Sequence, residues 1–272
     1  LADRVTGRFA DADKVRRLDF EGQWYRSRGP FTVPRTKQGR PVLIQAGQSG
    51  RGQRFAARWG ELVFAVYPNI EVGRKIYAGF KDQVKKAGRD PASVKVAPAV
   101  YIIPGETRTM AEAKMELIDK LAKPVDALAL LSEVLNFDFA SKKMDEAFTD
   151  AELKSISGLQ AIRDRVVASS GKKNPTIRDF VEVSNRGTIR EFPLFVGSPK
   201  DIADKMEEWF ATEACDGFVV AGTHLPGSYE DFVRLVVPEL QRRGLFRKEY
   251  AGTTLRDHLG LPRASIGDWK GS

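Results

Sequence analysis

The residues whose types and spacing could bind a ligand lie at 47–52, where the chain reads Gly47-Gln48-Ser49-Gly50-Arg51-Gly52. Glycines let a backbone approach an anion closely, and Ser49 adds a hydroxyl. The run follows a short apolar segment and precedes a helical pattern, so unpaired N–H groups at the helix start would meet the same anion. This chemistry suits phosphate binding, and the spacing suits an ordinary tight turn equally well.

The run matches neither of two common phosphate-binding motifs. No Gly-Lys-Ser/Thr follows, and the spacing of Gly47 and Ser49 departs from the Gly-x-Gly-x-x-Gly of dinucleotide-binding folds. Other candidate ligand contacts are His224, which follows the last predicted strand, and two arginines, Arg186 and Arg190, which suit a carboxylated or sulfonated substrate. A loop histidine and ordinary surface arginines are the simpler interpretations. No residue is assigned a catalytic role.

The elements around these residues alternate between short apolar strands and amphipathic helices. The predicted strands are 41–46, 62–66, 94–103 and 217–221, and the predicted helices are 52–59, 70–87, 198–211 and 228–240. Asn69, Ser198 and Ser228 are the expected N-caps of the last three. Continuously apolar strands alternating with helices predict an α/β fold with a parallel sheet. Ligands in such folds bind beyond the carboxyl ends of the strands, where 47–52 falls.

A long helical stretch interrupts this alternation between about 105 and 192. Helix starts are predicted at Thr107, Pro124, Asp150 and Thr176, and the third helix is expected to run through Ile162. We expect a single domain over 1–272, with 105–192 as a helical insertion that forms a lid over the substrate pocket. Ile44 and Phe64 are expected in the core, and Asp216 is expected to make a structural loop contact.

Composition narrows the class of protein. The chain has 272 residues, 42% of them apolar and 29% charged, which excludes fibrous and disordered proteins. Its formal charge of +8 is spread along the sequence, and no module for binding nucleic acid is visible. Neither a membrane span nor histidines with the spacing of metal ligands can be found. The single cysteine, Cys215, is expected to be buried and fits a reducing cytoplasm.

The number of strands raises the question of how the sheet is completed. About four strand–helix units make either an open sheet or half of an eight-fold barrel. The chain opens at Leu1, and its first methionine is Met110. We therefore expect a piece of a longer protein, namely the C-terminal half of a barrel.

Two stretches of sequence resemble a known family. Residues 30–57 read PFTVPRTKQGRPVLIQAGQSGRGQRFAA, and 214–256 contain Ala-Cys-Asp-Gly-Phe, Leu-Pro-Gly and Val-Pro-Glu-Leu-Gln-Arg-Arg-Gly-Leu-Phe-Arg. Both are similar to the bacterial luciferase-like flavin monooxygenases. The branch is that of pristinamycin synthase and of the nitrilotriacetate, EDTA and dibenzothiophene sulfone monooxygenases. The resemblance implies a (β/α)8 TIM barrel of the luciferase-like type, with about its C-terminal half present together with the helical insertion.

The resemblance also implies a reaction. Members of the family are two-component monooxygenases that use reduced FMN, from a separate NAD(P)H:flavin oxidoreductase, and O2 to oxygenate a small organic substrate. The Gln-Ala-Gly-x-Ser motif places Ser49 on the FMN phosphate, with Gly47 and Gln48 lining the same turn. The catalytic groups of the family lie mostly before the point that matches Leu1, so they have no counterpart here. We further expect a homo-oligomer.

Two other functions remain open at this stage. The chain could be a non-catalytic half-barrel or FMN-binding fragment that needs a partner chain. It could also be a deazaflavin-dependent dehydrogenase of the same superfamily, although the motif at 45–49 favours the monooxygenase. The sequence does not identify the substrate, because members with closely similar motifs oxidise different compounds.

Overall fold

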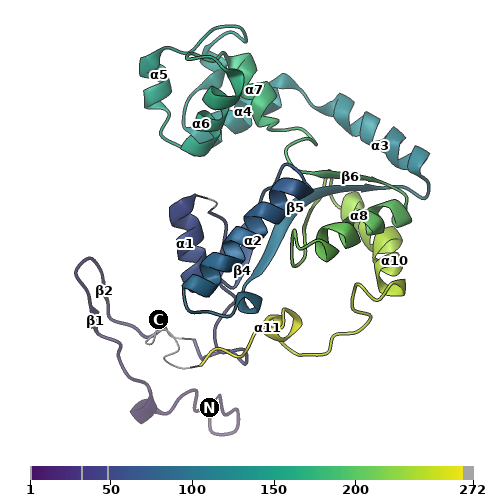
Figure 1. Cartoon of the computed structure of the whole chain (residues 1–272). Helices are drawn as coiled ribbons and strands as arrows, with labels where there is room; N and C mark the ends of the chain where they lie inside the picture. Colours follow the sequence, from purple (N-terminus) through teal and green to yellow (C-terminus); the bar gives the residue numbers. More distant parts are fainter. Residues whose placement is uncertain (1, 32, 48, 266–272) are drawn as a thin grey trace.

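A parallel sheet forms the centre of the structure (Figure 1). The structure is a computed structural model, and it describes residues 2–265 except 32 and 48. In this part of the chain the sheet contains β3 (Ile44–Gln45), β4 (Leu62–Ala65), β5 (Lys95–Pro104), β6 (Leu194–Gly197) and β7 (Val219–Ala221). The order is β3-β4-β5-β6, with β7 also paired to β5. The predicted parallel α/β architecture is therefore confirmed.

Helices follow the strands as the sequence pattern predicts. They are α1 (Gly50–Trp59), α2 (Ile70–Lys86), α8 (Pro199–Ala211), α9 (Gly227–Asp231), the π-helical η4 (Phe232–Val236) and α10 (Val237–Arg242). Two of the predicted N-caps are confirmed, since Asn69 accepts from the Val72 N–H at 3.0 Å and Ser198 accepts from the Asp201 N–H at 3.3 Å. The third is wrong, because Ser228 lies inside the first turn of α9.

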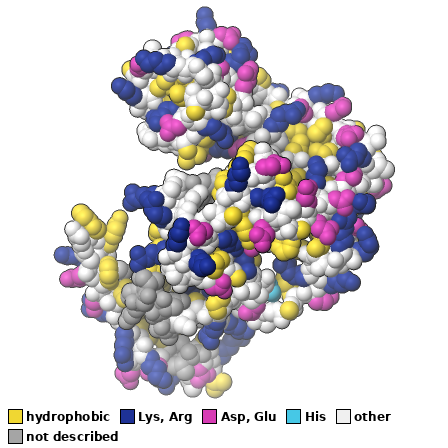
Figure 2. Space-filling model, in the orientation of Figure 1, with side chains coloured by type: hydrophobic (Ala, Val, Ile, Leu, Met, Phe, Trp, Pro, Cys, Tyr) yellow, Lys and Arg dark blue, Asp and Glu magenta, His cyan; other side chains and the backbone are white. Residues whose placement is uncertain are grey.

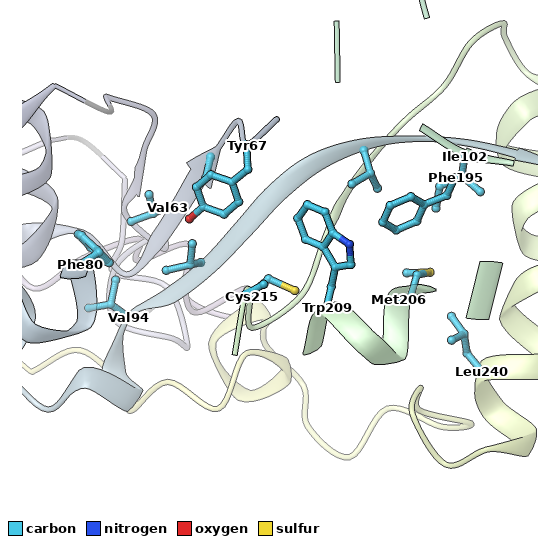
Figure 3. Close-up of a cluster of buried hydrophobic side chains, with 14 of the residues drawn as sticks. Val63, Tyr67, Phe80, Val94, Ile102, Phe195, Met206, Trp209, Cys215 and Leu240 are labelled. Carbon is cyan, nitrogen blue, oxygen red and sulfur yellow. The ribbon is translucent and has the colours of Figure 1, made fainter. Parts of the chain in front are cut away.

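The main hydrophobic core lies between this sheet and its helices. Figure 3 shows Trp209 and Met206 of α8 close to Phe195 of β6, and the ring centroids of Trp209 and Phe195 are 5.8 Å apart. Val63 of β4 and Phe80 of α2 gather at the other end of the same core. This core packs α2 and α8 against the sheet.

The first strand of the sheet corrects a prediction. The sequence predicts a buried strand over 41–46, yet β3 contains two residues, and Ile44 is 62% exposed. Ile44 pairs with Leu62 of β4 on one side, and β3 lies at the edge of the sheet. A strand with one neighbour in the described sheet leaves its apolar side chains uncovered, so the core position expected for Ile44 is wrong. Phe64, on β4, is half-buried.

The strand β6 has no counterpart among the strands predicted from sequence. It pairs with the second half of β5, with Tyr101 opposite Leu194 and Pro104 opposite Gly197. Four residues after a long helical stretch are too few for a periodic pattern to identify. The strand is stabilised by its pairing with β5, which is distant in sequence, and by packing against α8.

The segment 105–192 contains five α-helices among the described residues. They are α3 (Arg108–Leu121), α4 (Pro124–Leu135), α5 (Asp150–Ser155), α6 (Gln160–Ser170) and α7 (Ile177–Ser184). The last four enclose a hydrophobic cluster of their own, built around Phe139, Phe148 and Phe180, and Figure 1 shows them as a group above the sheet. α3 instead contacts β5 and β6. Whether 105–192 acts as a lid stays a prediction.

The single helix predicted from Asp150 through Ile162 is wrong, because the chain breaks between α5 and α6. The N–H of Gly158 donates to the carbonyl of Leu135 at 3.2 Å. A Cβ at Gly158 would lie 2.1 Å from the carbonyl oxygen of Val134. The approach of α4 therefore interrupts a pattern that is helical by its own spacing.

Both ends of the described chain lie on the same side of the molecule (Figure 1). The first residues carry η1 (Ala12–Lys14) and an antiparallel hairpin of β1 (Phe20–Glu21) and β2 (Arg26–Ser27). The last helix, α11 (Leu255–His258), returns to the start of β4, where Arg256 pairs with Glu61. Two short turns, η2 (Pro91–Ser93) and η3 (Phe139–Ser141), complete the elements.

The surface carries charges of both signs. Figure 2 shows lysines and arginines interspersed with aspartates and glutamates over the visible face, as the spread of charge along the sequence predicts. Among the described residues, none of the helices combines the length and the apolar composition needed to cross a bilayer.

Candidate functional site

The turn between β3 and α1 places Ser49 at the start of a helix and at the carboxyl end of a strand. Ser49 is the N-cap of α1, and its Oγ accepts a hydrogen bond from the Gly52 N–H at 3.1 Å. A hydroxyl that accepts one bond retains its own hydrogen for donation. Because Ser49 is exposed, this hydrogen can reach an acceptor that arrives from solvent.

Two glycines close this turn. The N–H of Gly47 donates to Oε1 of Gln45 at 2.7 Å. A Cβ at Gly52 would lie 2.8 Å from the carbonyl oxygen of Gly47, which is closer than real Cβ contacts come. Both glycines are predicted from sequence. The hydrogen bond from Gly47 to the Gln45 side chain is not, although Gln45 is the first residue of the motif at 45–49. Gln48 lies outside the described residues.

The electrostatics of the turn favour an anion. The first turn of α1 contains no acidic residue, and the exposed arginines Arg51 and Arg54 follow the cap. The N-terminus of a helix carries a partial positive charge and N–H groups without intrahelical partners. Basic side chains there add to this charge, so the turn repels cations and attracts anions. The charge of the turn is thus compatible with a phosphate group, and the binding of phosphate by Ser49 and Gly47 stays a prediction.

The two candidate arginines each pair with a carboxylate of this chain. Arg186 forms an ion pair with Glu191, and Arg190 forms one with Asp119 at 2.8 Å. One nitrogen of each guanidinium is paired in this way, while the buried Nε of Arg186 has no hydrogen-bond partner.

Asp216 is a structural residue, as predicted. It accepts from the Tyr77 hydroxyl at 2.9 Å and from the Val96 N–H at 2.8 Å, and its other partner is Lys81 at 2.9 Å. These contacts join α2 to β5 and to the loop before β7.

Cys215 is buried, which confirms the prediction. Its side chain is 2% exposed, and burial raises the pKa of the thiol to about 12. A thiol that stays protonated at neutral pH is a poor nucleophile. Cys215 is part of the main hydrophobic core, where it acts as a small apolar side chain.

A separate hollow of about 490 Å³ lies on α5 and α6, on other elements than the turn. Four of its charged lining residues pair with one another, Lys173 with Asp150 at 2.9 Å and Arg163 with Asp164 at 2.7 Å. The strand-end turn at Ser49 is therefore the better candidate for an anionic ligand.

Comparison with known proteins identifies the family. The family model for luciferase-like monooxygenases matches residues 6–216, which include the Ser49 turn. The chain belongs to this family. It is 38% identical to the dibenzothiophene-sulfone monooxygenase of Rhodococcus erythropolis, an alignment that covers 96% of this chain. It is 39% identical to nitrilotriacetate monooxygenase component A of Aminobacter aminovorans, over 97% of this chain. The branch predicted from sequence is confirmed.

Solved structures of luciferase-like relatives share the fold. The crystal structure of DmoA from Hyphomicrobium sulfonivorans matches 95% of this chain and 54% of its own, with a TM-score of 0.74 and 32% identity. A riboflavin lyase holding modified FMN and riboflavin matches 96% of this chain and 56% of its own, with a TM-score of 0.77 and 28% identity. The predicted luciferase-like fold is confirmed, with the sheet forming part of a TIM barrel. The chain spans 58% of the length of the two sequence relatives.

Proposed function

We propose that this luciferase-like protein is the oxygenating component of a two-component, reduced-FMN-dependent monooxygenase. The observation that carries the proposal is the Ser49 turn, an exposed and acid-free helix start at the carboxyl end of a strand. Both sequence relatives are named as monooxygenases, and one of them as a component A. The similar riboflavin lyase holds a modified FMN. A family fold and a site suited to phosphate together favour FMN as cofactor.

The residues of the turn have separate tasks in this proposal. The Ser49 hydroxyl donates to a phosphate oxygen, and the first N–H groups of α1 point toward the same group. Gly47 and Gly52 keep the turn narrow enough for these donors to converge. Arg51 and Arg54 add attraction for the dianion. Bound reduced FMN would supply the electrons that activate O2, and the turn would fix the cofactor against the strand ends.

Further expectations belong to the same proposal. A separate NAD(P)H:flavin oxidoreductase would supply the reduced FMN, and a small organic compound would be the oxygenated substrate. Met110, Leu117 and Leu121 expose 53%, 61% and 65% of their surface on α3, which suits the predicted homo-oligomer. The helices of 105–192 would cover the substrate. A cytoplasmic location is expected from the single cysteine.

Ser49→Ala tests the site. Loss of the hydroxyl should weaken FMN binding by about 1–3 kcal/mol, measured by quenching of flavin fluorescence. Riboflavin has no phosphate, so its affinity should stay the same in the variant. Thr107→Ala removes an equivalent cap, the hydrogen bond to the Met110 N–H at 3.3 Å, and serves as the control for lost helix stability.

The FMN affinities of the two variants distinguish a phosphate contact at Ser49 from a general loss of helix stability. Weaker FMN binding in Ser49→Ala but not in Thr107→Ala supports a phosphate site at the turn. Equal FMN affinity in both variants and in the unchanged protein removes Ser49 from the site. A screen of small organic substrates with a flavin reductase, NADH, FMN and O2 tests the activity. The absence of both FMN binding and substrate-dependent oxygen uptake would contradict the monooxygenase assignment.

A further inference from the structure

A histidine lies at the same edge of the sheet as the Ser49 turn. β3 and β7 run parallel to each other through their pairing with β4 and β5, so their carboxyl ends face the same way. His224 follows the last residue of β7, Ala221, by three positions and is exposed. Ligands of parallel α/β folds bind at this edge. His224 is therefore on the ligand-binding side of the sheet.

Two hydroxyls fix the His224 ring. Nδ1 lies 3.1 Å from Oγ of Ser228 and 3.1 Å from Oγ1 of Thr223, and the two hydroxyl oxygens are themselves 3.1 Å apart. Ser228 is 4% exposed, and its Oγ also accepts from the backbone N–H of His224 at 2.8 Å. The buried hydroxyl thus holds both the backbone and the ring of an exposed residue. An ordinary surface histidine has no such support.

The two hydroxyls of this cluster can supply the hydrogen bond that Nδ1 accepts. Each hydroxyl has one hydrogen to donate. When Ser228 or Thr223 donates to Nδ1, the other hydroxyl donates within the pair, and both hydrogens are used. The neutral ring then carries its proton on Nε2. Within the described residues no hydrogen bond reaches Nε2, so in this tautomer the Nε2 hydrogen has no acceptor in the protein.

A glycine lets the imidazole lie close to the start of α9. A Cβ at position 227 would lie 2.7 Å from Nε2 of His224, a contact that would displace the ring. Gly227 is also the first residue of α9, so the short helix begins directly beside the imidazole. Hydroxyl contacts at Nδ1, a glycine that makes room for the ring and an exposed residue position are the arrangement of a side chain positioned for a ligand.

We propose that Nε2 of His224 donates a hydrogen bond to the isoalloxazine ring of the bound flavin, and that Ser228 positions it. This inference rests on the proposed function, since it needs a flavin whose phosphate lies at Ser49. β4 and β5 separate β3 from β7 in the sheet, so His224 lies away from the phosphate end. A flavin that extends along the strand ends would bring the oxygen and nitrogen acceptors of its ring toward Nε2.

Binding of FMN and of riboflavin distinguishes this contact from the phosphate site. The ring is common to both ligands, so His224→Ala should weaken both by about five- to tenfold, the effect of one hydrogen bond. His224→Gln, whose amide can place a donor near Nε2, should restore part of the affinity for both. Ser49→Ala should weaken FMN alone. His258, which contacts the carbonyl of Gly252, provides the control variant His258→Gln.

Nuclear magnetic resonance of the two histidine rings gives a readout independent of activity. The chain contains only His224 and His258, so two ring signals are assigned by the two single variants. In the free protein His224 should show the Nε2–H tautomer, and Ser228→Ala should change its tautomer ratio. Thr223→Val provides a second test of the tether in case Ser228→Ala fails to fold. Riboflavin should shift the His224 signal and leave the His258 signal unchanged.

The outcomes distinguish failure of the His224 contact from failure of the proposed function. If FMN binds and Ser49→Ala weakens it, while His224→Ala affects neither ligand and the His224 signal does not move, this inference is overturned and the proposed function stands. If neither flavin binds the unchanged protein, both are overturned. Parallel losses for FMN and riboflavin in His224→Ala, together with partial rescue by His224→Gln, support the contact.

Discussion

At the scale of single residues, two glycines of the same turn differ in what they can tolerate. A Cβ at Gly52 would meet the backbone of Gly47 at 2.8–3.0 Å, whereas a Cβ at Gly50 would meet only the end of the Arg54 side chain at 3.5 Å. Gly52→Ala should therefore open the turn and weaken FMN binding. Gly50→Ala should keep the affinity and gain up to about 1 kcal/mol of stability from helix propensity. Flavin titration and chemical denaturation of both variants measure the contrast.

The two glycine variants also test the geometry of the turn without changing a polar group. Equal FMN affinity in Gly50→Ala and Gly52→Ala would contradict the close approach of Gly47 and Gly52. Ser49 and the N–H groups of α1 would then bind phosphate without a narrow turn.

At the scale of elements, the break between α5 and α6 depends on its packing against α4. Gly158→Ala would place a methyl group 2.1 Å from the carbonyl oxygen of Val134, so we expect a loss of more than about 2 kcal/mol in the free energy of unfolding. In a continuous helix the same change would stabilise by about 1 kcal/mol. The sign of the change in unfolding free energy, measured by urea denaturation, therefore distinguishes a break between α5 and α6 from one continuous helix.

Gly79→Ala in α2 provides the matched control. A Cβ at Gly79 has nothing within 4 Å and lies in a regular helix, so alanine should stabilise by about 0.5–1 kcal/mol. Stabilisation by both variants would refute the break and restore the single helix predicted from Asp150.

At the scale of the whole molecule, the buried ion pair between Arg256 and Glu61 connects the C-terminal segment to the start of β4. Arg256 is 2% exposed and donates two hydrogen bonds to Glu61, at 2.6 and 2.9 Å, and a third to the Pro262 carbonyl. Arg256→Leu leaves a buried carboxylate without its main partner, which should cost about 3–5 kcal/mol of unfolding free energy, measured by urea denaturation. Arg178→Leu, which breaks an exposed pair with Asp145, should cost less than about 1 kcal/mol.

The same pair should make stability depend on pH. Burial alone would raise the pKa of Glu61. Hydrogen bonds from Arg256, from the Leu43 N–H and from Arg40 outweigh burial and lower the pKa from its ordinary 4.5 to about 2. The stabilisation is therefore full above pH 4.5 and is lost as the pH falls toward 2. The difference between the unchanged protein and Arg256→Leu should shrink over this range. A constant difference in acid denaturation would exclude Glu61 as the group involved.

The sequence by itself determined the family, the parallel α/β class, most helix starts and the helix cap at Ser49. These features depend on residues close together in the sequence. The cap Ser198 accepts a hydrogen bond from the Asp201 N–H, three positions further on, and the motif at 45–49 is contiguous. Local rules are sufficient for them, so a single sequence carries them.

Only the tertiary structure decided the features that depend on distant partners. The exposure of Ile44 follows from the edge position of β3, and the break at Gly158 follows from the approach of α4. Glu61 meets Arg256 across 195 positions of sequence. The support of His224 by Ser228 spans only four positions, yet it needs the chain to fold back at the end of β7. Contacts of this kind are set by the packing of whole elements, which the spacing of residues along the chain does not encode.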